Sequence, residues 1–404
     1  MTMGDVSGRD RTMYLDRALK AADWYVNSQL NQCEYGDEWH ADRGRFLYHY
    51  YMPEKKHTPG INWTQGRALF VLSEACKITG DERYRDAAEL GYRYVAALQV
   101  MDPGYPQIAG AIKEETPQCS RCGALDGAQA ASGLLMFEKV TGNADALRRA
   151  RAFCDYLLRH FDDESGLPAL AYVYPEEKVV HVGGYARHAI GQCTAIPCWH
   201  LYRRTGEEKY LEPVVWGADF ILDCQRDDGA FHNVKDIARA EPPRPNHHEG
   251  RGEGDHRYVL YNDDGMIVII LAAHLATGDD RYLDAAVRYA DWIVGQPVEE
   301  RPFCAFPVRA NTVLDVGRLA GKDYSAWVLD HLQEHVLDLQ VEGSGDPKAE
   351  GGFRGEDEED EGGIYGGTSL DYVTNRVTCY AAGLLFRLSG RGTGAGFSPW
   401  GLED

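Results

Sequence analysis

The sequence predicts an all-α protein, an (α/α)6 toroid in which six helical hairpins form an inner and an outer ring of helices. Three observations support this prediction. A helical-hairpin phrase recurs along the 404 residues, nearly all-apolar helices alternate with amphipathic ones, and tight turns alternate with long loops. Repeats of this kind indicate one closed architecture rather than a string of domains. No Ser/Pro-rich linker divides the chain, so we expect residues 1–404 to form a single barrel domain.

The recurring phrase is an apolar helix that ends in Thr-Gly, followed by charged residues, often a Tyr, and then a second helix. Clear copies start at Ile78, Arg204 and Ala276, and weaker copies start at Val140 and Leu319. Glycine after a helix supplies the left-handed cap that lets the chain reverse. Acidic residues after it favour the start of the next helix, whose N-terminus carries a partial positive charge. The repeating unit is therefore a helical hairpin.

The two helices of each hairpin differ in composition. First helices, such as 68–76, 128–137 and 266–273, are apolar nearly all round, which predicts burial on both sides in an inner ring. Second helices are rich in charged residues and have one apolar face, which predicts an outer ring. The expected inner helices start near Asn62, Asp126, Arg187, Asn262, Asn311 and Asp371. The expected outer helices span 13–30, 81–99, 144–160, 207–225, 279–296 and 324–340.

The loops that lead from outer to inner helices are long, whereas the reverse connections are tight turns. The long loops span 31–61, 100–125, 161–186, 226–261 and 341–370. Long loops in a compact domain commonly carry function. One end of the toroid should hold these loops together with the N-terminal ends of the inner helices, and we expect the site there.

Polar and aromatic residues gather at the expected N-terminal ends of the inner helices. An Asp or Asn at a helix start is commonly an N-cap, but capping does not explain Trp or Arg there. Aromatic rings stack on the apolar face of a pyranose, while amides, carboxylates and guanidinium groups bind its hydroxyls. The predicted substrate-binding residues at the helix ends are Trp63, Gln65, Arg67, Arg187, His188, Tyr261, Asn262, Asn375 and Arg376.

A Gly-rich loop at 245–257 holds three His, two Arg and three acidic residues. Its spacing matches no common set of metal ligands, so no metal is expected there. We interpret it either as a lid that carries cationic groups over an anionic sugar or as a solvated flexible loop. In the lid hypothesis the substrate-binding residues are His247, His248, Arg251 and His256.

Three carboxylates are candidates for acid/base chemistry. Glycoside hydrolysis needs a protonated carboxyl group and a second carboxylate across the scissile bond. Asp126, Asp263 and Asp264 project from neighbouring parts of the expected rim, and we predict that they are catalytic. The sequence therefore favours a glycoside hydrolase, and the cationic groups of the loop 245–257 suit an oligosaccharide that contains uronic acid.

Composition argues against several other classes of protein. A net charge of −21 repels phosphate backbones and anionic lipid, so neither nucleic acid nor a membrane is an expected partner. The CxxC of Cys119 and Cys122 lacks the second pair that structural zinc needs, and no cofactor is expected. The acidic run 356–361 is interpreted as a solvated turn. Scattered cysteines and the lack of a basic-then-apolar segment in 1–11 predict a cytoplasmic protein.

The hairpin rhythm resembles that of the six-hairpin glycosidase superfamily, and distantly that of the unsaturated glucuronyl hydrolases. The most specific segment is Asp126 followed by GAQAASGLLMFEKVTGN. It is similar to the segment in which that family carries an aspartate at the head of its second inner helix, which implies a catalytic role for Asp126. The family's second aspartate would fall in 189–193, which reads AIGQC. Either Asp263 or Asp264 takes that role, or the chemistry differs.

The same toroid occurs in polysaccharide lyases and sugar 2-epimerases, so the resemblance leaves other chemistries open. A lyase needs a Tyr or His base and a group that neutralises the uronate carboxylate. The candidates for these roles are Arg187, His188, His256, Tyr261 and Asn262. An epimerase needs two opposed bases, which the histidines could supply. A non-catalytic toroid that binds carbohydrate is the remaining alternative.

Overall fold

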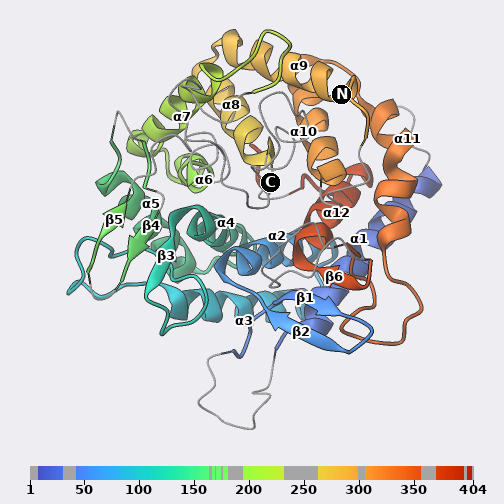
Figure 1. Cartoon of the computed structure of the whole chain (residues 1–404), viewed down its shortest axis with the longest axis horizontal. Helices are drawn as coiled ribbons and strands as arrows, with labels where there is room; N and C mark the ends of the chain where they lie inside the picture. The colour runs from blue at the N-terminus through green and yellow to red at the C-terminus, as the bar shows by residue number, and fades with distance from the viewer. Residues whose placement is uncertain are drawn as a thin grey trace.

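The computed structural model describes residues 8–30, 42–162, 166–168, 170–173, 176–180, 194–231, 263–298, 305–355, 370–394 and 398–402. For 8–9, 263–266 and 305 it describes the backbone alone. Within these ranges the helices form two concentric rings (Figure 1). The fold is therefore the expected all-α (α/α)6 toroid.

The inner ring is closed. Its helices are α2 (Asn62–Thr79), α4 (Ala124–Thr141), α6 (Ile196–Thr205), α8 (Asp263–Thr277), α10 (Ala305–Ala320) and α12 (Asn375–Leu388). Each of these helices contacts the next, and α12 contacts α2 (Figure 1). Three of them start away from the expected positions. Helix α6 begins at Ile196 rather than near Arg187. Helix α10 is already formed at Ala305 rather than near Asn311, and α12 begins at Asn375 because a strand occupies the residues before it.

The outer ring consists of the charged helices of the hairpins. They are α1 (Gly8–Ser28), α3 (Glu82–Leu98), α5 (Ala144–Arg159), α7 (Glu212–Leu222), α9 (Asp280–Val294) and α11 (Ser325–His335). Two expected outer helices are divided. A 3-10 turn, η2 (Glu208–Tyr210), precedes α7, where Pro213 stands in the first turn, and η4 (Leu337–Leu339) follows α11.

The Thr-Gly turns share one hydrogen-bonding pattern. The hydroxyl of Thr79 donates to the carbonyl of Ala75 at 2.7 Å and accepts the backbone N–H of Asp81 at 3.1 Å. The same two bonds recur at Thr141, Thr205 and Thr277. The glycine that follows each Thr has a φ near 70°, which is the left-handed cap. Threonine thus ties the end of one helix to the start of the next.

The tyrosine of the repeat links neighbouring outer helices. Tyr282, in α9, donates a hydrogen bond of 2.7 Å to Asp219 in α7. Equivalent bonds join Tyr84 to Asp23, Tyr210 to Asp155 and Tyr324 to Asp291. Each pair places a buried phenol against a carboxylate of the preceding outer helix, so the repeated Tyr holds the outer ring together.

Four glutamines at the ends of outer helices anchor the long loops. The amide nitrogen of Gln99 donates to the carbonyl of Gly110, where the loop returns, and to that of Arg149 in the next outer helix, both at 2.9 Å. A Cβ at Gly110 would lie 2.0 Å from the carbonyl oxygen of Ala152, so only glycine permits this approach. Three further residues each donate in the same way to a loop glycine and to a neighbouring outer helix: Gln29, Gln225 and Gln340. We call all four the glutamine anchors.

The last of these anchors closes the outer ring. Gln340, which follows η4, donates to the carbonyl of Gly351 at 2.8 Å and to that of Arg17 in α1 at 2.9 Å. Residues 323 positions apart in the chain are joined in this way. The bond from Gln340 to Arg17 therefore joins the last outer helix to the first.

Two small antiparallel sheets are present. Five of their strands lie in the long loops, where the sequence analysis expected no regular structure, and β6 occupies residues expected to begin the sixth inner helix. One has the order β2 (Lys56–Pro59), β1 (Leu47–Tyr51), β6 (Tyr372–Thr374). The other has the order β3 (Arg121–Gly123), β4 (Leu170–Tyr172), β5 (Val179–Val180). Strand β6 runs directly into α12, and β3 runs directly into α4. These strands therefore fix the first residues of two inner helices.

The C-terminal residues 390–394 and 398–402 pack against the opposite end of the inner ring. The indole of Trp199 donates to the carbonyl of Pro399 at 2.6 Å. The buried carboxylate of Glu74 accepts the backbone N–H groups of Thr393 at 2.6 Å and Gly394 at 3.1 Å. Burial raises the pKa of Glu74 to about 7 although these donors and the nearby Arg387 oppose the shift. This end of the ring is thus covered, and the loop end holds the candidate site.

Candidate functional site

Asp126 stands in the first turn of α4, at the end of the ring where the long loops gather. Its side chain keeps some exposure to solvent. Desolvation is the largest cause that raises the pKa of Asp126 to about 7, and the charge of Glu114 adds to it. The charges of Arg67, Arg121 and Arg376 oppose this shift. The residue is therefore a carboxyl group that can hold a proton near neutral pH and still reach a ligand.

Glu114 is a member of the site that the sequence analysis did not select. Its backbone is held on both sides: its carbonyl accepts the N–H of Asn62 at the head of α2, and its N–H donates to the carbonyl of Arg121 in β3. Its side chain is 12% exposed and pairs with the Arg121 guanidinium at 3.1 Å. Burial raises the pKa of Glu114, and Arg121 opposes that rise. No pattern in the loop 100–125 distinguishes this glutamate before the pairing of β3 is known.

Gly123 leaves the space in which the two carboxylates meet. A Cβ built on Gly123 would lie 2.7 Å from Oε1 of Glu114 and 3.2 Å from Oδ2 of Asp126. Both oxygens thus border the same small volume above the end of β3. A side chain at this position would displace the glutamate, because 2.7 Å is closer than a carbon and an oxygen approach without a bond.

Arg67 is a buried cation next to Asp126. Its Nε donates to Gln129 at 2.6 Å and its Nη2 donates to the hydroxyl of Tyr380 at 2.8 Å. Its guanidinium carbon lies 4.3 Å from the ring centroid of Trp63 and 4.7 Å from that of Tyr380. Such contacts on aromatic faces hold the charge in one orientation. Arg67 therefore places a fixed positive charge between Asp126 and the aromatic rings of Trp63 and Tyr380.

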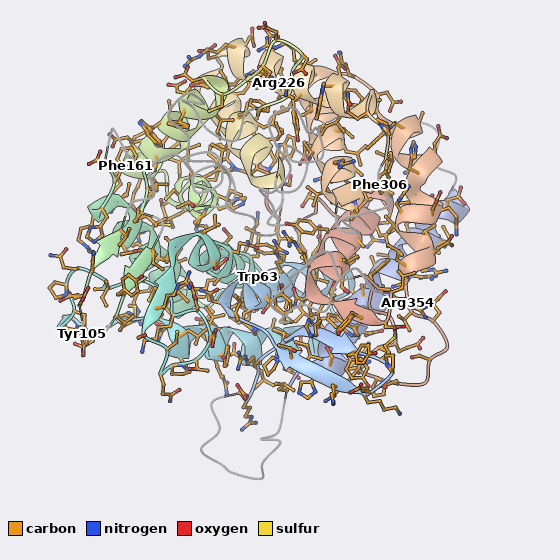
Figure 2. The ribbon with its side chains drawn as sticks, viewed as in Figure 1. Trp63, Tyr105, Phe161, Arg226, Phe306 and Arg354 are labelled. Carbon is orange, nitrogen blue, oxygen red and sulfur yellow. The ribbon has the colours of Figure 1, made fainter. Side chains whose placement is uncertain are left out.

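The aromatic wall consists of Trp63 and Tyr48. Trp63, in the first turn of α2, keeps part of its surface exposed, and Figure 2 places it on the inner side of the ring close to α2 and α4. The ring of Tyr48, in β1, packs edge-on against it with centroids 5.3 Å apart. Trp63 thus has the exposure that stacking on a sugar ring requires.

Two of the expected substrate-binding residues lie below the rim instead. Gln65 is fully buried, and its amide oxygen accepts the backbone N–H of Phe46 at 2.9 Å. Asn375 is also fully buried and donates to the carbonyl of Leu47 at 3.1 Å. Both amides bind the backbone at the start of β1, a strand that the sequence analysis did not expect. In the structure they hold that strand to the inner helices, and their contact with substrate stays a prediction.

Arg376, in the first turn of α12, remains partly exposed, and its charge lowers the pKa of Asp126. The backbone of Asp263 and Asp264 forms the first turn of α8, but their side chains lie outside the described residues. Eight other candidates also lie outside them: Arg187, His188, His247, His248, Arg251, His256, Tyr261 and Asn262. Asp126, Trp63, Arg67 and Arg376 are thus the predicted site residues that the described part of the chain brings together.

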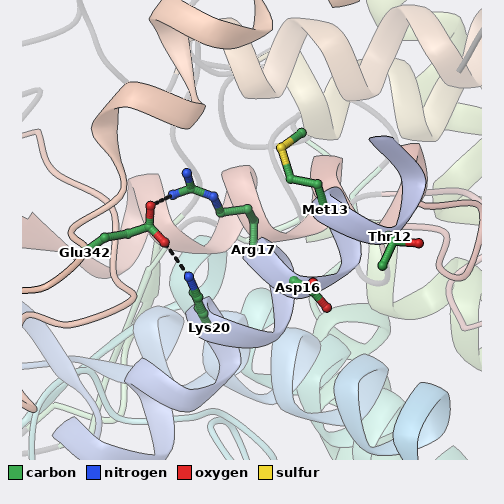
Figure 3. Close-up of a pocket in the computed structure, with 6 residues that line it drawn as sticks. All are labelled: Thr12, Met13, Asp16, Arg17, Lys20 and Glu342. Atoms are coloured by element: carbon green, nitrogen blue, oxygen red, sulfur yellow. Dashed lines mark hydrogen bonds and ion pairs between the residues drawn. The ribbon is translucent and has the colours of Figure 1, made fainter. Parts of the chain in front are cut away.

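A surface hollow beside α1 is unrelated to this site. Figure 3 shows it between α1 and Glu342, whose carboxylate forms ion pairs with both Arg17 and Lys20.

No group of three or more His, Cys, Asp or Glu residues suited to a metal ion occurs within the described ranges. Among the helices that the structure describes, none is long and apolar enough to cross a membrane.

The chain is similar in structure to several carbohydrate-active proteins. An unsaturated glucuronyl hydrolase specific for heparin superposes with a TM-score of 0.66 at 11% identity, covering 94% of this chain and 97% of the other. A sugar epimerase from a ruminal bacterium has a TM-score of 0.64 at 14% identity, covering 94% and 98%. An inactive α-1,6-mannanase of glycoside hydrolase family 76 from Salegentibacter, with α-1,6-mannotriose bound, has a TM-score of 0.58 at 15% identity, covering 94% and 99%.

These similarities show that the chain has the (α/α)6 fold of these proteins, which is the fold that its sequence resemblance predicted. The sequence itself matches no family model. It also matches no curated protein.

Proposed function

We propose that this chain is a glycoside hydrolase in which Asp126 is the general acid. The observation that carries the proposal is a carboxyl group at the head of an inner helix, still accessible, whose pKa is raised to about 7. A general acid works best when its pKa lies near the working pH. Asp126 would donate its proton to the glycosidic oxygen as the bond to the sugar breaks, and would become a carboxylate.

A second carboxylate is needed to stabilise or attack the sugar carbon. We assign this role to Asp263 or Asp264, which stand together in the first turn of another inner helix. The inactive mannanase variant noted above carries asparagine in place of two consecutive aspartates, and Asp263 and Asp264 are also consecutive. This likeness supports the assignment.

We further propose that the substrate is an oligosaccharide that contains uronic acid. In a chain of net charge −21, cationic side chains approach Asp126 from β3 and α12. Arg121 is 58% exposed beyond its contact with Glu114, and Arg376 is partly exposed. Guanidinium groups bind carboxylates in a planar, two-pronged geometry. These arginines would select a uronate over a neutral sugar beside Trp63.

The test is a panel of oligosaccharides with unsaturated uronate, saturated uronate or only neutral α-1,6-mannose at the cleaved end. New reducing ends from uronate substrates, lost in Asp126→Asn, would support the proposal. Rising absorbance of an unsaturated product would show β-elimination instead, and would overturn the assignment as a hydrolase. Cleavage of the mannoside alone would support the assignment as a hydrolase but would overturn the proposed uronate substrate. Binding without turnover on the whole panel would favour a non-catalytic toroid.

A further inference from the structure

We propose that Glu114 is a positioning residue that keeps the proton on Asp126 by placing a fixed negative charge beside it. The inference rests on the role of Asp126 as proton donor proposed above. It assigns to Glu114 a function that acts through Asp126 rather than on the sugar.

The backbone around Glu114 fixes where its carboxylate lies. The bonds from its carbonyl to Asn62 and from its N–H to Arg121 hold the glutamate between the head of α2 and β3. Because β3 continues directly into α4, the same strand places Asp126. The distance between the two carboxylates is therefore determined by one short stretch of ordered backbone, and Gly123 leaves the space between them open.

Among the described residues, the charged groups that act on Asp126 come from four elements. Glu114 lies in the loop before β3, Arg121 in β3, Arg67 in α2 and Arg376 in α12. The glutamate is the one group among them whose charge raises the pKa of Asp126, and the three arginines lower it. Without Glu114, desolvation alone would oppose the three arginines, and the pKa of Asp126 would fall.

The ion pair with Arg121 decides which carboxyl group holds the proton. Two carboxyl groups that share a desolvated space do not both ionise readily, so one retains its proton. The guanidinium of Arg121 lies 3.1 Å from Oε1 of Glu114, and this contact favours the ionised form of the glutamate. The proton therefore stays on Asp126, where the chemistry requires it.

The same arrangement favours recovery of the acid after each turnover. When Asp126 transfers its proton to the glycosidic oxygen, it becomes a carboxylate next to the carboxylate of Glu114. Repulsion between the two charges then favours return of a proton from water to Asp126. The pair begins and ends the cycle with one proton and one negative charge.

The experiment is a pH titration of the Asp126 carboxyl carbon in protein labelled with 13C-aspartate, without substrate, with the signal assigned by its loss in Asp126→Asn. We expect Glu114→Gln to lower the titration midpoint by about one pH unit or more, because a neighbouring like charge is removed. The matched control is Glu115→Gln, which removes the same charge from an exposed residue one position away and should leave the midpoint nearly unchanged.

An unchanged midpoint in folded Glu114→Gln, or equal shifts in Glu114→Gln and Glu115→Gln, would overturn the inference. If Glu114→Gln does not fold, Gly123→Ala provides the second test, since its Cβ displaces the Glu114 carboxylate and should also lower the midpoint. The titration needs no activity, so its result is independent of whether the protein hydrolyses any glycoside. Where hydrolysis is found, the alkaline limb of the kcat/KM profile should move to lower pH in Glu114→Gln.

Discussion

Tyr282 of α9 donates a hydrogen bond of 2.7 Å to Oδ1 of Asp219 in α7. The same oxygen also accepts a hydrogen bond of 2.6 Å from Nη2 of Arg281. The phenol ring is fully buried, while about half of the aspartate side chain is exposed. Burial, together with the Asp219 carboxylate, raises the pKa of Tyr282 to about 12. A single carboxylate therefore links two outer helices through a neutral donor and a cation.

We expect Tyr282→Phe to reduce the free energy of unfolding by about 1 kcal/mol, the usual net contribution of one hydrogen bond. The ring remains to fill its site, so the effect isolates the hydroxyl. Urea denaturation followed by circular dichroism would measure it. Tyr105→Phe, at an exposed tyrosine in a loop, is the control. Equal midpoints for the two variants would show that the Tyr–Asp pairs do not stabilise the outer ring.

We expect Asp126→Asn to reduce turnover by about 10³-fold or more, because an amide cannot donate the transferred proton. Folding should persist, since asparagine suits a helix start as well as aspartate does. Steady-state rates on the substrate identified by the panel would measure the loss. Asp86→Asn, on the exposed face of α3, should keep the normal rate.

At least one of Asp263→Asn and Asp264→Asn should show a loss of similar size. Near-normal rates in all three asparagine variants would refute the glycosidase assignment. In that case β-elimination remains, and Tyr261→Phe or His256→Ala should then abolish activity. The same rate measurements therefore separate hydrolysis from elimination.

Stability should depend on the ionisation of Glu74. Its pKa is raised to about 7 in the folded chain, above the ordinary value of 4.5, so folding favours the protonated form. The contribution of Glu74 is thus fully present below about pH 4.5 and is lost as the pH rises through about 7. We expect the Tm of the wild type to fall relative to that of Glu74→Gln across this window. A constant difference across the window, or the same change in the exposed control Glu82→Gln, would contradict this account.

Gly142→Ala should destabilise the chain by about 1 kcal/mol, because its φ of 70° strains any residue with a Cβ. No atom lies within 4 Å of the added methyl group, so the loss reports backbone strain alone. Gly295→Ala is the matched control, since the φ of −81° there suits alanine and the nearest atom is 3.4 Å away. Thermal unfolding of both variants would test this. An equal Tm for the two would show that the left-handed turn is not required.

The hairpins could be predicted from the sequence because their signals are local. Each Thr-Gly turn is fixed by bonds between residues two to four positions apart, such as those of Thr79. The strands could not be predicted in this way. His49 pairs with Thr374, which is far away in the sequence, so a short stretch of sequence cannot predict that contact.

The candidate site could likewise be predicted only where its signals are local in the sequence. Asp126 and Trp63 follow from their places at helix starts, which periodicity locates. The burial of Gln65 and Asn375 follows from β1, so it could not be anticipated without that strand. Glu114 enters the site only through the pairing of its backbone with Asn62 and β3. Contacts distant in sequence, rather than weak local signals, account for these differences.

The glutamine anchors separate the architecture of the ring from the length of its loops. Gln225 bonds to a glycine four residues later, whereas Gln29 bonds to one fifteen residues later, and both also bind the next outer helix. The distance spanned in space is set by the amide, so the chain between Gln and Gly can grow or shrink without moving a helix. Such loops can be exchanged as modules, and one scaffold can thereby acquire new specificities while its frame stays unchanged.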